Sequence, residues 1–420
     1  MSPSTSQLAP LRLPAFRNLF LATCGSSIGT LLAAVALAID VKDRTSGSPH
    51  SGLWVGAVLV VEFLPTIAVG LLLGPLLDRL DRRSLMIAAD ALRVAVFAAL
   101  PFASNAATVV GLAFVAGLAT GFFRPAVYAG VPNLVDEELL PQANALLQTV
   151  ENFSWTIGPV LGGLLTAAAG PNASYAINAA SFVVSILLIV RIPPRLLQSE
   201  RALTRGYWTD LGDGFMAALR SRSMRAVLVA WGIASLGIGA ANVSEIFLAK
   251  NTFSAGDFGY GLLYGAIGAG LVIGALVSPR LLERWGVAAV YGGSLTVMGL
   301  GYVATGVSPN VWAGAACCVV LGVGNGAAVA CNALLVQRGI FDAMRGRALT
   351  FVMSVTYLAV AIGEGVGGAY STAAHARWEW GAAGASLVVA AAGGWVIARK
   401  LGGETAAEGE LAPAAVATAP

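Results

Sequence analysis

Charged residues are scarce in this sequence, and their scarcity excludes an ordinary soluble protein. Asp, Glu, Lys and Arg make up 11% of the 420 residues, whereas 57% of the residues are hydrophobic and the mean hydropathy is +0.77. A soluble chain of this length could not bury so much apolar surface and stay dispersed. Most of the chain is therefore expected to lie in lipid.

The residues that usually build metal, nucleotide and nucleic-acid sites are also few. The only histidines are His50 and His375, both in polar stretches, which excludes a histidine-based metal centre. The cysteines lie in apolar runs without metal-ligand spacing and are interpreted as packing residues: Cys24, Cys317, Cys318 and Cys331. No phosphate-binding loop, basic stripe or catalytic constellation is present, so we expect no ATP-driven step, nucleic-acid partner, enzyme activity or cofactor.

The apolar residues fall into runs long enough to cross a bilayer, which takes about 20 residues as a helix. Backbone groups in lipid must be satisfied internally, so each run is expected to be helical. No cleavable signal peptide is evident, and the first run is expected to serve as an uncleaved targeting signal. The twelve predicted spans are 18–40, 53–77, 84–103, 106–131, 146–169, 173–191, 225–248, 258–282, 287–306, 309–334, 348–371 and 379–398.

The sequence predicts an all-α polytopic membrane protein with twelve transmembrane helices in two pseudo-symmetric six-helix bundles. The bundles are expected at 1–192 and 225–402, with a cytoplasmic linker at 193–224 and a disordered tail at 403–420. Trp208 and Phe215 favour an interfacial amphipathic helix within the linker.

The placement of Lys and Arg predicts the orientation. If both termini are cytoplasmic, the outer side carries only Lys42, Arg44, Lys250 and Arg377, while Arg93 and Arg124 lie within spans. All the other Lys and Arg residues then lie on the cytoplasmic side, as the positive-inside rule requires.

Glycine patterns recur between the halves at a constant offset of 205 residues. Gly158-Pro-Val-Leu-Gly162-Gly163 in the fifth span matches Gly363-Glu-Gly-Val-Gly367-Gly368 in the eleventh. Gly117 and Gly121 in the fourth span match Gly322 and Gly326 in the tenth. A shared offset indicates an internal repeat, which is common among secondary transporters.

The loop after the second span carries the most specific pattern in the chain. Gly74, Asp78, Arg79, Arg82 and Arg83 fill the pattern Gly-x-x-x-Asp-Arg-x-x-Arg-Arg, which resembles the loop signature of the major facilitator superfamily. Asp81 occupies the position where that family usually has a glycine. The resemblance implies a gating role for this loop.

The fifth span strengthens the resemblance. Gly158, Pro159, Gly162 and Gly163 look like the Gly-Pro-x-x-Gly-Gly end of the motif associated with the superfamily's antiporters; the bent helix and its glycines would pack tightly enough to seal one side. The alternative is a packing motif with no bearing on transport.

Four further segments resemble the macrolide-efflux and siderophore-exporter branch of the drug:proton antiporters: Phe16-Arg-Asn-Leu-Phe20, Phe123-Arg124-Pro-Ala126, Pro132-Asn-Leu-Val135 and Ala143-Asn-Ala-Leu146. Arg124 lies later in its span than the superfamily's fourth-helix arginine. The resemblance implies a monomeric inner-membrane exporter of small amphipathic compounds that is driven by proton influx. The alternatives are an importer or uniporter, and a sensor that does not transport.

Ionisable residues inside spans are costly and are therefore functional candidates. Glu62 and Glu364 are predicted to carry the coupling proton, although Glu62 could instead contact a cationic substrate. Asp40 and Glu245 lie at the outer ends of two spans, 205 residues apart. They either take part in proton coupling or substrate binding, or simply reach water.

The remaining ionisable residues are assigned to gating. Asp90 and Arg93 are expected to pair with the Asp78 loop, in a structural or a gating role. Arg124 and Glu151 should meet between adjacent antiparallel helices, in an ion pair that forms or breaks as the cavity opens.

Overall fold

The computed structural model describes residues 7–72, 80–197, 222–339, 345–372 and 374–392. The predictions on Gly74, Asp78, Arg79, the linker helix around Trp208 and the tail lie outside these residues. Each predicted span overlaps a helix of the described chain.

The first half of the chain forms long helices joined by short turns. Pro14 opens the first of them, as proline commonly does at the first helical turn. The helices are α1 (Pro14–Arg44), α2 (Ser51–Leu72), α4 (Arg82–Ala99), α5 (Ala106–Gly130), α6 (Leu140–Ala169) and α7 (Pro171–Val190). Short 3₁₀ turns flank them at Ala9–Arg12, Leu100–Phe102, Val131–Asn133, Glu137–Leu139 and Pro194–Leu196.

The second half contains α9 (Arg222–Phe247), the π-helical turn η6 (Leu248–Thr252), α10 (Gly256–Val307), α11 (Val311–Gly339), α12 (Arg345–Tyr370) and a helix at 376–392. α10 is two helices joined at Gly286, whose φ of 73° and ψ of 164° are not helical. Only glycine adopts this conformation at low cost. The break falls between the predicted spans 258–282 and 287–306.

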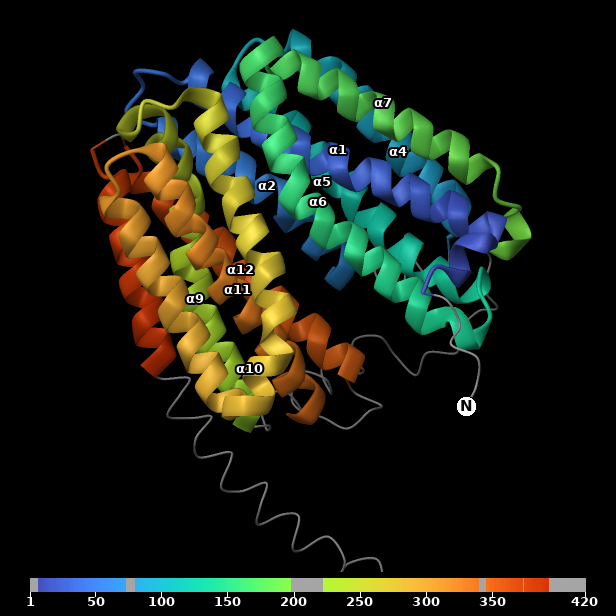
Figure 1. The fold of residues 1–420 in the computed structure, drawn as a ribbon. Helices are drawn as coiled ribbons and strands as arrows, with labels where there is room; N and C mark the ends of the chain where they lie inside the picture. Colours follow the sequence, from blue (N-terminus) through green and yellow to red (C-terminus); the bar gives the residue numbers. More distant parts are fainter. Residues whose placement is uncertain (1–6, 73–79, 198–221, 340–344, 373, 393–420) are drawn as a thin grey trace, which may run out of the picture.

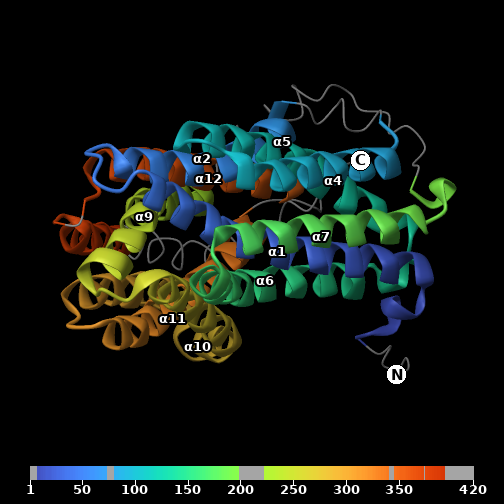
Figure 2. The same ribbon diagram turned by 90° about the horizontal axis from the view of Figure 1, so that it is seen from above.

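The helices of each half gather into a separate group (Figures 1 and 2). Within the first group α1 packs against α6 and α7, and α2 packs against α5. Within the second, α9 packs against α12 and α10 against α11. The groups meet where α6 packs on α10 and where α2 packs on α12.

The chain is a multi-pass membrane protein. Among the described residues, 7 helices are long and apolar enough to cross a bilayer. Large apolar side chains also face outward, such as Leu187 (57% exposed) and Val389 (66% exposed). Such a surface suits lipid tails rather than water.

The two groups touch through glycines at the end of the molecule where α1 finishes, here called the Arg44 end. A Cβ added to Gly163 of α6 would lie 2.6 Å from Cα of Gly261 in α10. A Cβ added to Gly368 of α12 would lie 2.8 Å from the carbonyl oxygen of Gly52 in α2. The helix backbones therefore leave no room for a side chain at either crossing. Toward the opposite end the two groups diverge (Figure 1).

Candidate functional site

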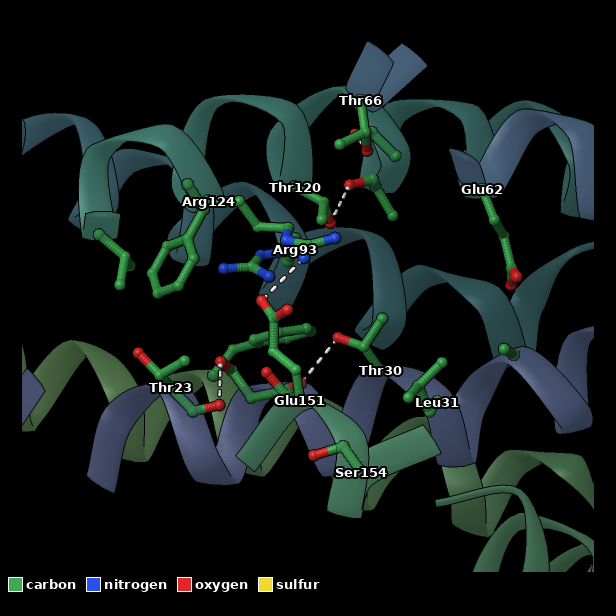
Figure 3. A pocket seen from close by; sticks show the side chains of 18 of the residues that line it. Thr23, Thr30, Leu31, Glu62, Thr66, Arg93, Thr120, Arg124, Glu151 and Ser154 are labelled. Atoms are coloured by element: carbon green, nitrogen blue, oxygen red, sulfur yellow. Dashed lines mark hydrogen bonds and ion pairs between the residues drawn. The ribbon is translucent and has the colours of Figure 1, made fainter. Parts of the chain in front are cut away.

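The larger pocket lies inside the first half, among α1, α2, α4, α5, α6 and α7 (Figure 3). It contains and opens onto about 1060 Å³ of empty space. The side chains of six helices converge on this space, which makes it a candidate site for a small ligand. Ionisable side chains in its wall are Glu62, Arg93, Arg124, Tyr128 and Glu151.

Arg93 is held by its own helix and by two aromatic rings. It pairs with Asp90, one turn earlier in α4, and both side chains are buried. The guanidinium carbon lies 4.3 Å from the ring centre of Phe123 and 4.2 Å from that of Phe182. Cation–π contact and the ion pair together replace the water that the charge has lost. The structure pairs the two residues with each other, while their predicted partner, the loop at Asp78, lies outside the described residues.

Arg124 and Glu151 face each other across the pocket (Figure 3). Nη2 of Arg124 in α5 lies 2.7 Å from Oε1 of Glu151 in α6, so the predicted ion pair is present. The Arg124 side chain is 44% exposed, and solvent therefore weakens the pair. A partly solvated contact of this kind can break and re-form at little cost.

Glu62 lies apart from these residues, where the larger pocket adjoins a smaller one (Figure 3). The smaller pocket holds about 410 Å³ of empty space between the two halves. Glu364 of α12 lines it as well, together with Asn242, Tyr260 and Tyr264. Nδ2 of Asn242 lies 3.3 Å from Oε1 of Glu364 and donates to it. The structure thus brings together two carboxyl groups that the sequence selected separately.

The expectation that Asp40 and Glu245 simply reach water is wrong. Asp40 is buried, accepting from Nε of Arg44 at 2.7 Å and from the hydroxyl of Tyr175 at 3.0 Å. Glu245 is 2% exposed, and among the described residues its Oε1 has no hydrogen-bond partner. Position near a span's end did not reveal which face of the helix carries the carboxyl group.

Two arginines of the loop signature lie in the described chain, and each donates hydrogen bonds to the end of a neighbouring helix. Nη1 of Arg82 donates to the carbonyl of Ala129 at 2.8 Å, and Nη2 of Arg83 donates to the carbonyl of Val190 at 2.6 Å. Both carbonyls belong to the last turns of helices, where a cation is favourable. Asp81 caps α4 by accepting from the backbone N–H of Ser84 at 2.8 Å. A carboxylate at this position therefore starts the helix.

The glycine motif of α6 makes two different contacts. Gly158 and Gly162 face α1, where an added Cβ on Gly158 would lie 2.7 Å from Cβ of Leu31. Gly163 faces α10 and forms part of the crossing at the Arg44 end. Pro159 lies between these glycines and lines the smaller pocket. The motif therefore joins the inside of one half to the contact between halves.

One ion cluster between the halves was not predicted. Nζ of Lys250 lies 2.6 Å from Oδ1 of Asp43, in the last turn of α1, and 2.7 Å from Oδ1 of Asp257 in α10. The three residues bridge the groups at the Arg44 end. No local pattern reveals a contact across 207 positions, although all three residues fall in predicted outer loops or span ends.

No group of three or more His, Cys, Asp or Glu side chains that could hold a metal ion occurs in the described part of the chain.

Comparison with known proteins gives a family match and a shared fold. Residues 5–411 match the family model described as transmembrane secretion effector. Over 283 residues the chain is 31% identical to the enterobactin exporter EntS of Shigella boydii serotype 18, and 30% identical to that of Escherichia coli O1:K1 / APEC. Each match covers 64% of this chain and 64% of the relative.

Solved structures agree in fold over nearly the whole chain. A bacterial homologue of the iron transporter ferroportin, in its inward-facing state, has a TM-score of 0.73 at 16% identity, covering 92% of this chain and 98% of that one. The POT family transporter PepTSo has a TM-score of 0.71 at 12% identity, covering 93% and 98%. At sequence identities this low, the structural similarity shows only that these proteins share a fold.

Proposed function

Because this chain belongs to the transmembrane secretion effector family of the major facilitator superfamily, a family of membrane transporters and not of enzymes, we propose that it exports small amphipathic compounds by proton antiport. Two six-helix bundles, at 1–192 and 225–402, alternate access to a central site. The protein works as a monomer in the inner membrane with both termini in the cytoplasm. The similarity to enterobactin exporters favours export over import.

The observation that carries the proposal is the meeting of Glu62 and Glu364 in one pocket between the halves. Two carboxylates in a confined, poorly hydrated space repel each other, and a bound proton relieves the repulsion. The residues belong to different halves, so a rocking motion changes both their separation and their hydration. Proton uptake and release would then follow the conformation of the protein.

Glu62 also connects the proton site to the substrate site, since it lines both pockets. A substrate that enters the larger pocket reaches the carboxyl group whose proton state depends on Glu364. Exchange of the proton for the substrate is the thermodynamic requirement of an antiporter. Asp40 takes no part in this scheme because Arg44 and Tyr175 already satisfy it. Glu245 is a further buried acidic group, near the end of α9 in the second half.

Contacts at the two ends supply the gates. The Arg44 end is held by the crossing of Gly163 with Gly261 and by the Lys250 cluster with Asp43 and Asp257. At the opposite end, the pair of Arg124 and Glu151 is exposed enough to open and close. The loop residues Gly74, Asp78 and Arg79, which lie outside the described residues, are assigned to gating by the family resemblance alone.

Everted membrane vesicles test the direction and the coupling. A susceptibility and accumulation screen in an efflux-deficient host first supplies a substrate. Vesicles that accumulate this substrate when their interior is made acid, and lose it when the gradient is collapsed, support export by antiport. Accumulation only under the opposite gradient means import, and binding without flux in proteoliposomes means a sensor.

A further inference from the structure

The smaller pocket has a polar wall and an apolar wall, and they belong to different halves. The second half contributes four side chains that can form hydrogen bonds: Asn242, Tyr260, Tyr264 and Glu364. The first half contributes the carboxyl group of Glu62 among apolar side chains: Leu31, Ala34, Val35, Leu59 and Pro159. Among the side chains that line this pocket, those able to bond to the carboxyl pair therefore all come from the second half.

Asn242 forms such a bond to one member of the pair. Its Nδ2 lies 3.3 Å from Oε1 of Glu364, which is 2% exposed. The two residues lie on α9 and α12, whose backbones touch at this level: a Cβ added to Gly239 would lie 2.9 Å from the backbone nitrogen of Glu364. Helices packed this closely move as a unit. The bond from Asn242 is therefore expected to persist when the two halves change their relative position.

The contact of Glu364 with the first half is of a different kind. A Cβ added to Gly56 of α2 would lie 2.7 Å from the backbone carbonyl oxygen of Glu364. Gly56 and Glu62 lie on the same helix, so this crossing sets where Glu62 meets Glu364. In the proposed motion the halves part at this crossing. Glu364 thus has one polar neighbour that stays, Asn242, and one that leaves, Glu62.

We propose that Asn242 is a positioning residue for proton coupling: it holds Glu364 in the second half, so that the rocking motion separates the carboxyl pair. The inference rests on the proposed function, because it assigns a role at the same proton site. A glutamate side chain has several rotatable bonds, and without this bond Glu364 would be free to turn after Glu62. The pair would then keep its proton in both conformations, and substrate would move without net proton exchange.

An amide suits this task in both proton states of the pair. Its N–H groups donate to an ionised carboxylate, and its oxygen accepts from a protonated carboxyl group. Asn242 can therefore hold Glu364 before and after the proton leaves.

The internal repeat shows that this bond is not a packing feature common to both halves. At the offset of 205, Asn242 corresponds to Leu37 and Glu364 corresponds to Pro159. Neither counterpart has a side chain that forms hydrogen bonds. The comparison also supplies a test variant, since leucine is the residue that the first half carries at this position.

The first experiment measures coupling in Asn242→Leu, in everted vesicles that contain the full-length protein. The probes are ethidium and the best compound from the accumulation screen. Gradient-driven accumulation should fall at least about tenfold, the worth of one hydrogen bond to a charged group. Substrate-induced proton release, followed with a pH-sensitive dye, should fall with it. Exchange of labelled for unlabelled substrate without a gradient should continue, because the halves still rock.

Asn242→Asp keeps the shape of the side chain and makes the bond depend on pH. An ionised carboxyl group cannot donate to Glu364, whereas a protonated one can. The titratable groups around this position are Glu62, Glu364, Tyr260 and Tyr264 in the pocket, and Glu245 one turn further along α9. Relative to the unaltered protein, coupled accumulation should be lost near neutral pH. It should return when the pH on both sides is lowered by about two units at a constant difference.

Ser235→Ala is the matched control. Ser235 lies on the same helix, is buried, and its Oγ has no hydrogen-bond partner among the described residues. Its replacement should leave coupling unchanged. The inference is wrong if Ser235→Ala uncouples transport as Asn242→Leu does, or if Asn242→Leu loses exchange together with accumulation, since either result means that Asn242 only supports the fold of α9. Normal coupled accumulation by Asn242→Leu would overturn it as well.

The unaltered protein separates this inference from the proposed function. If it accumulates neither probe under a gradient, the proposed function fails and the inference fails with it. If it accumulates a probe with proton release and both Asn242 variants do the same at every pH, the proposed function stands and only the role of Asn242 is removed.

Discussion

Three glycines of α6 and their counterparts in α12 make matching contacts in the two halves of the molecule. Two of each set face the first helix of their own half, and the third meets the other half. The glycines of α5 and α11 also match, since each pair packs on the helix that precedes it by two spans. The pairs are Gly158 and Gly363, Gly162 and Gly367, Gly163 and Gly368, Gly117 and Gly322, and Gly121 and Gly326.

The same offset applied to the ionisable residues gives a different result. Asp90, Arg93, Arg124 and Glu151 correspond to Leu295, Met298, Val329 and Thr356. Glu62 corresponds to Ile267, and Glu364 corresponds to Pro159. The halves therefore share their glycine packing and differ in their ionisable residues. In the proposed transporter, the shared packing would serve the motion of the halves, and the differing residues would bind and couple.

The largest effect is expected from removing the carboxyl pair that the halves build together. Glu62→Gln and Glu364→Gln should each abolish gradient-driven export and keep substrate binding, because an amide retains the shape but cannot carry the proton. The measurement is accumulation in everted vesicles beside equilibrium binding. If Glu62→Gln instead loses binding of cationic compounds and still exports neutral ones with full coupling, Glu62 contacts the substrate and does not carry the proton.

A second experiment replaces residues of the first half with their counterparts from the second. Arg93→Met alone should destabilise the protein by about 3–5 kcal/mol, because it leaves Asp90 buried without its partner. Asp90→Leu together with Arg93→Met should recover most of that stability. Reversible unfolding in detergent gives both values. A double variant as unstable as the single one would mean that the pair itself, and not the unpaired charge, stabilises α4.

The shared packing can be broken at one crossing. Gly163→Leu should disfavour the closed Arg44 end by about 2 kcal/mol or more, a shift of roughly 30-fold between conformations, because overpacking a tight contact forces the backbones apart. Gly365→Leu is the control, since an added Cβ there meets nothing within 4 Å. Export rate and thermal stability are measured together. Equal rates in the two variants would exclude this crossing as a gate.

The smallest effect is expected for Arg124 and Glu151, which have no charged counterparts in the second half. Their coupling energy in a double-mutant cycle should be about 1 kcal/mol or less in the stability of the protein, since the arginine is partly exposed. Coupling in export rate should be larger than coupling in stability if the pair acts as a gate. Zero coupling in both measurements would assign the pair no role.

Local patterns in the sequence predicted the helices and the individual candidate residues. They did not predict which of these residues come into contact across different helices. Long apolar runs located the helices, because lipid imposes both length and hydrogen bonding on each run separately. The cost of charge in a span selected Glu62 and Glu364 one at a time. Their common pocket, the Lys250 cluster and the aromatic rings around Arg93 depend on how distant helices pack. The burial of Glu245 was missed for the same reason.

The confinement of the Asp90–Arg93 pair to one helix has a consequence for how the protein is made. A single charged side chain at the centre of a span costs about 2.5–3.5 kcal/mol on insertion. Arg93 carries its counter-ion three positions earlier on α4, so both charges reach the translocation channel already partnered. Phe123 and Phe182 lie on α5 and α7, which are synthesised later. The helix can therefore leave the channel as a neutral unit, and the rings then close around the arginine as the later helices arrive.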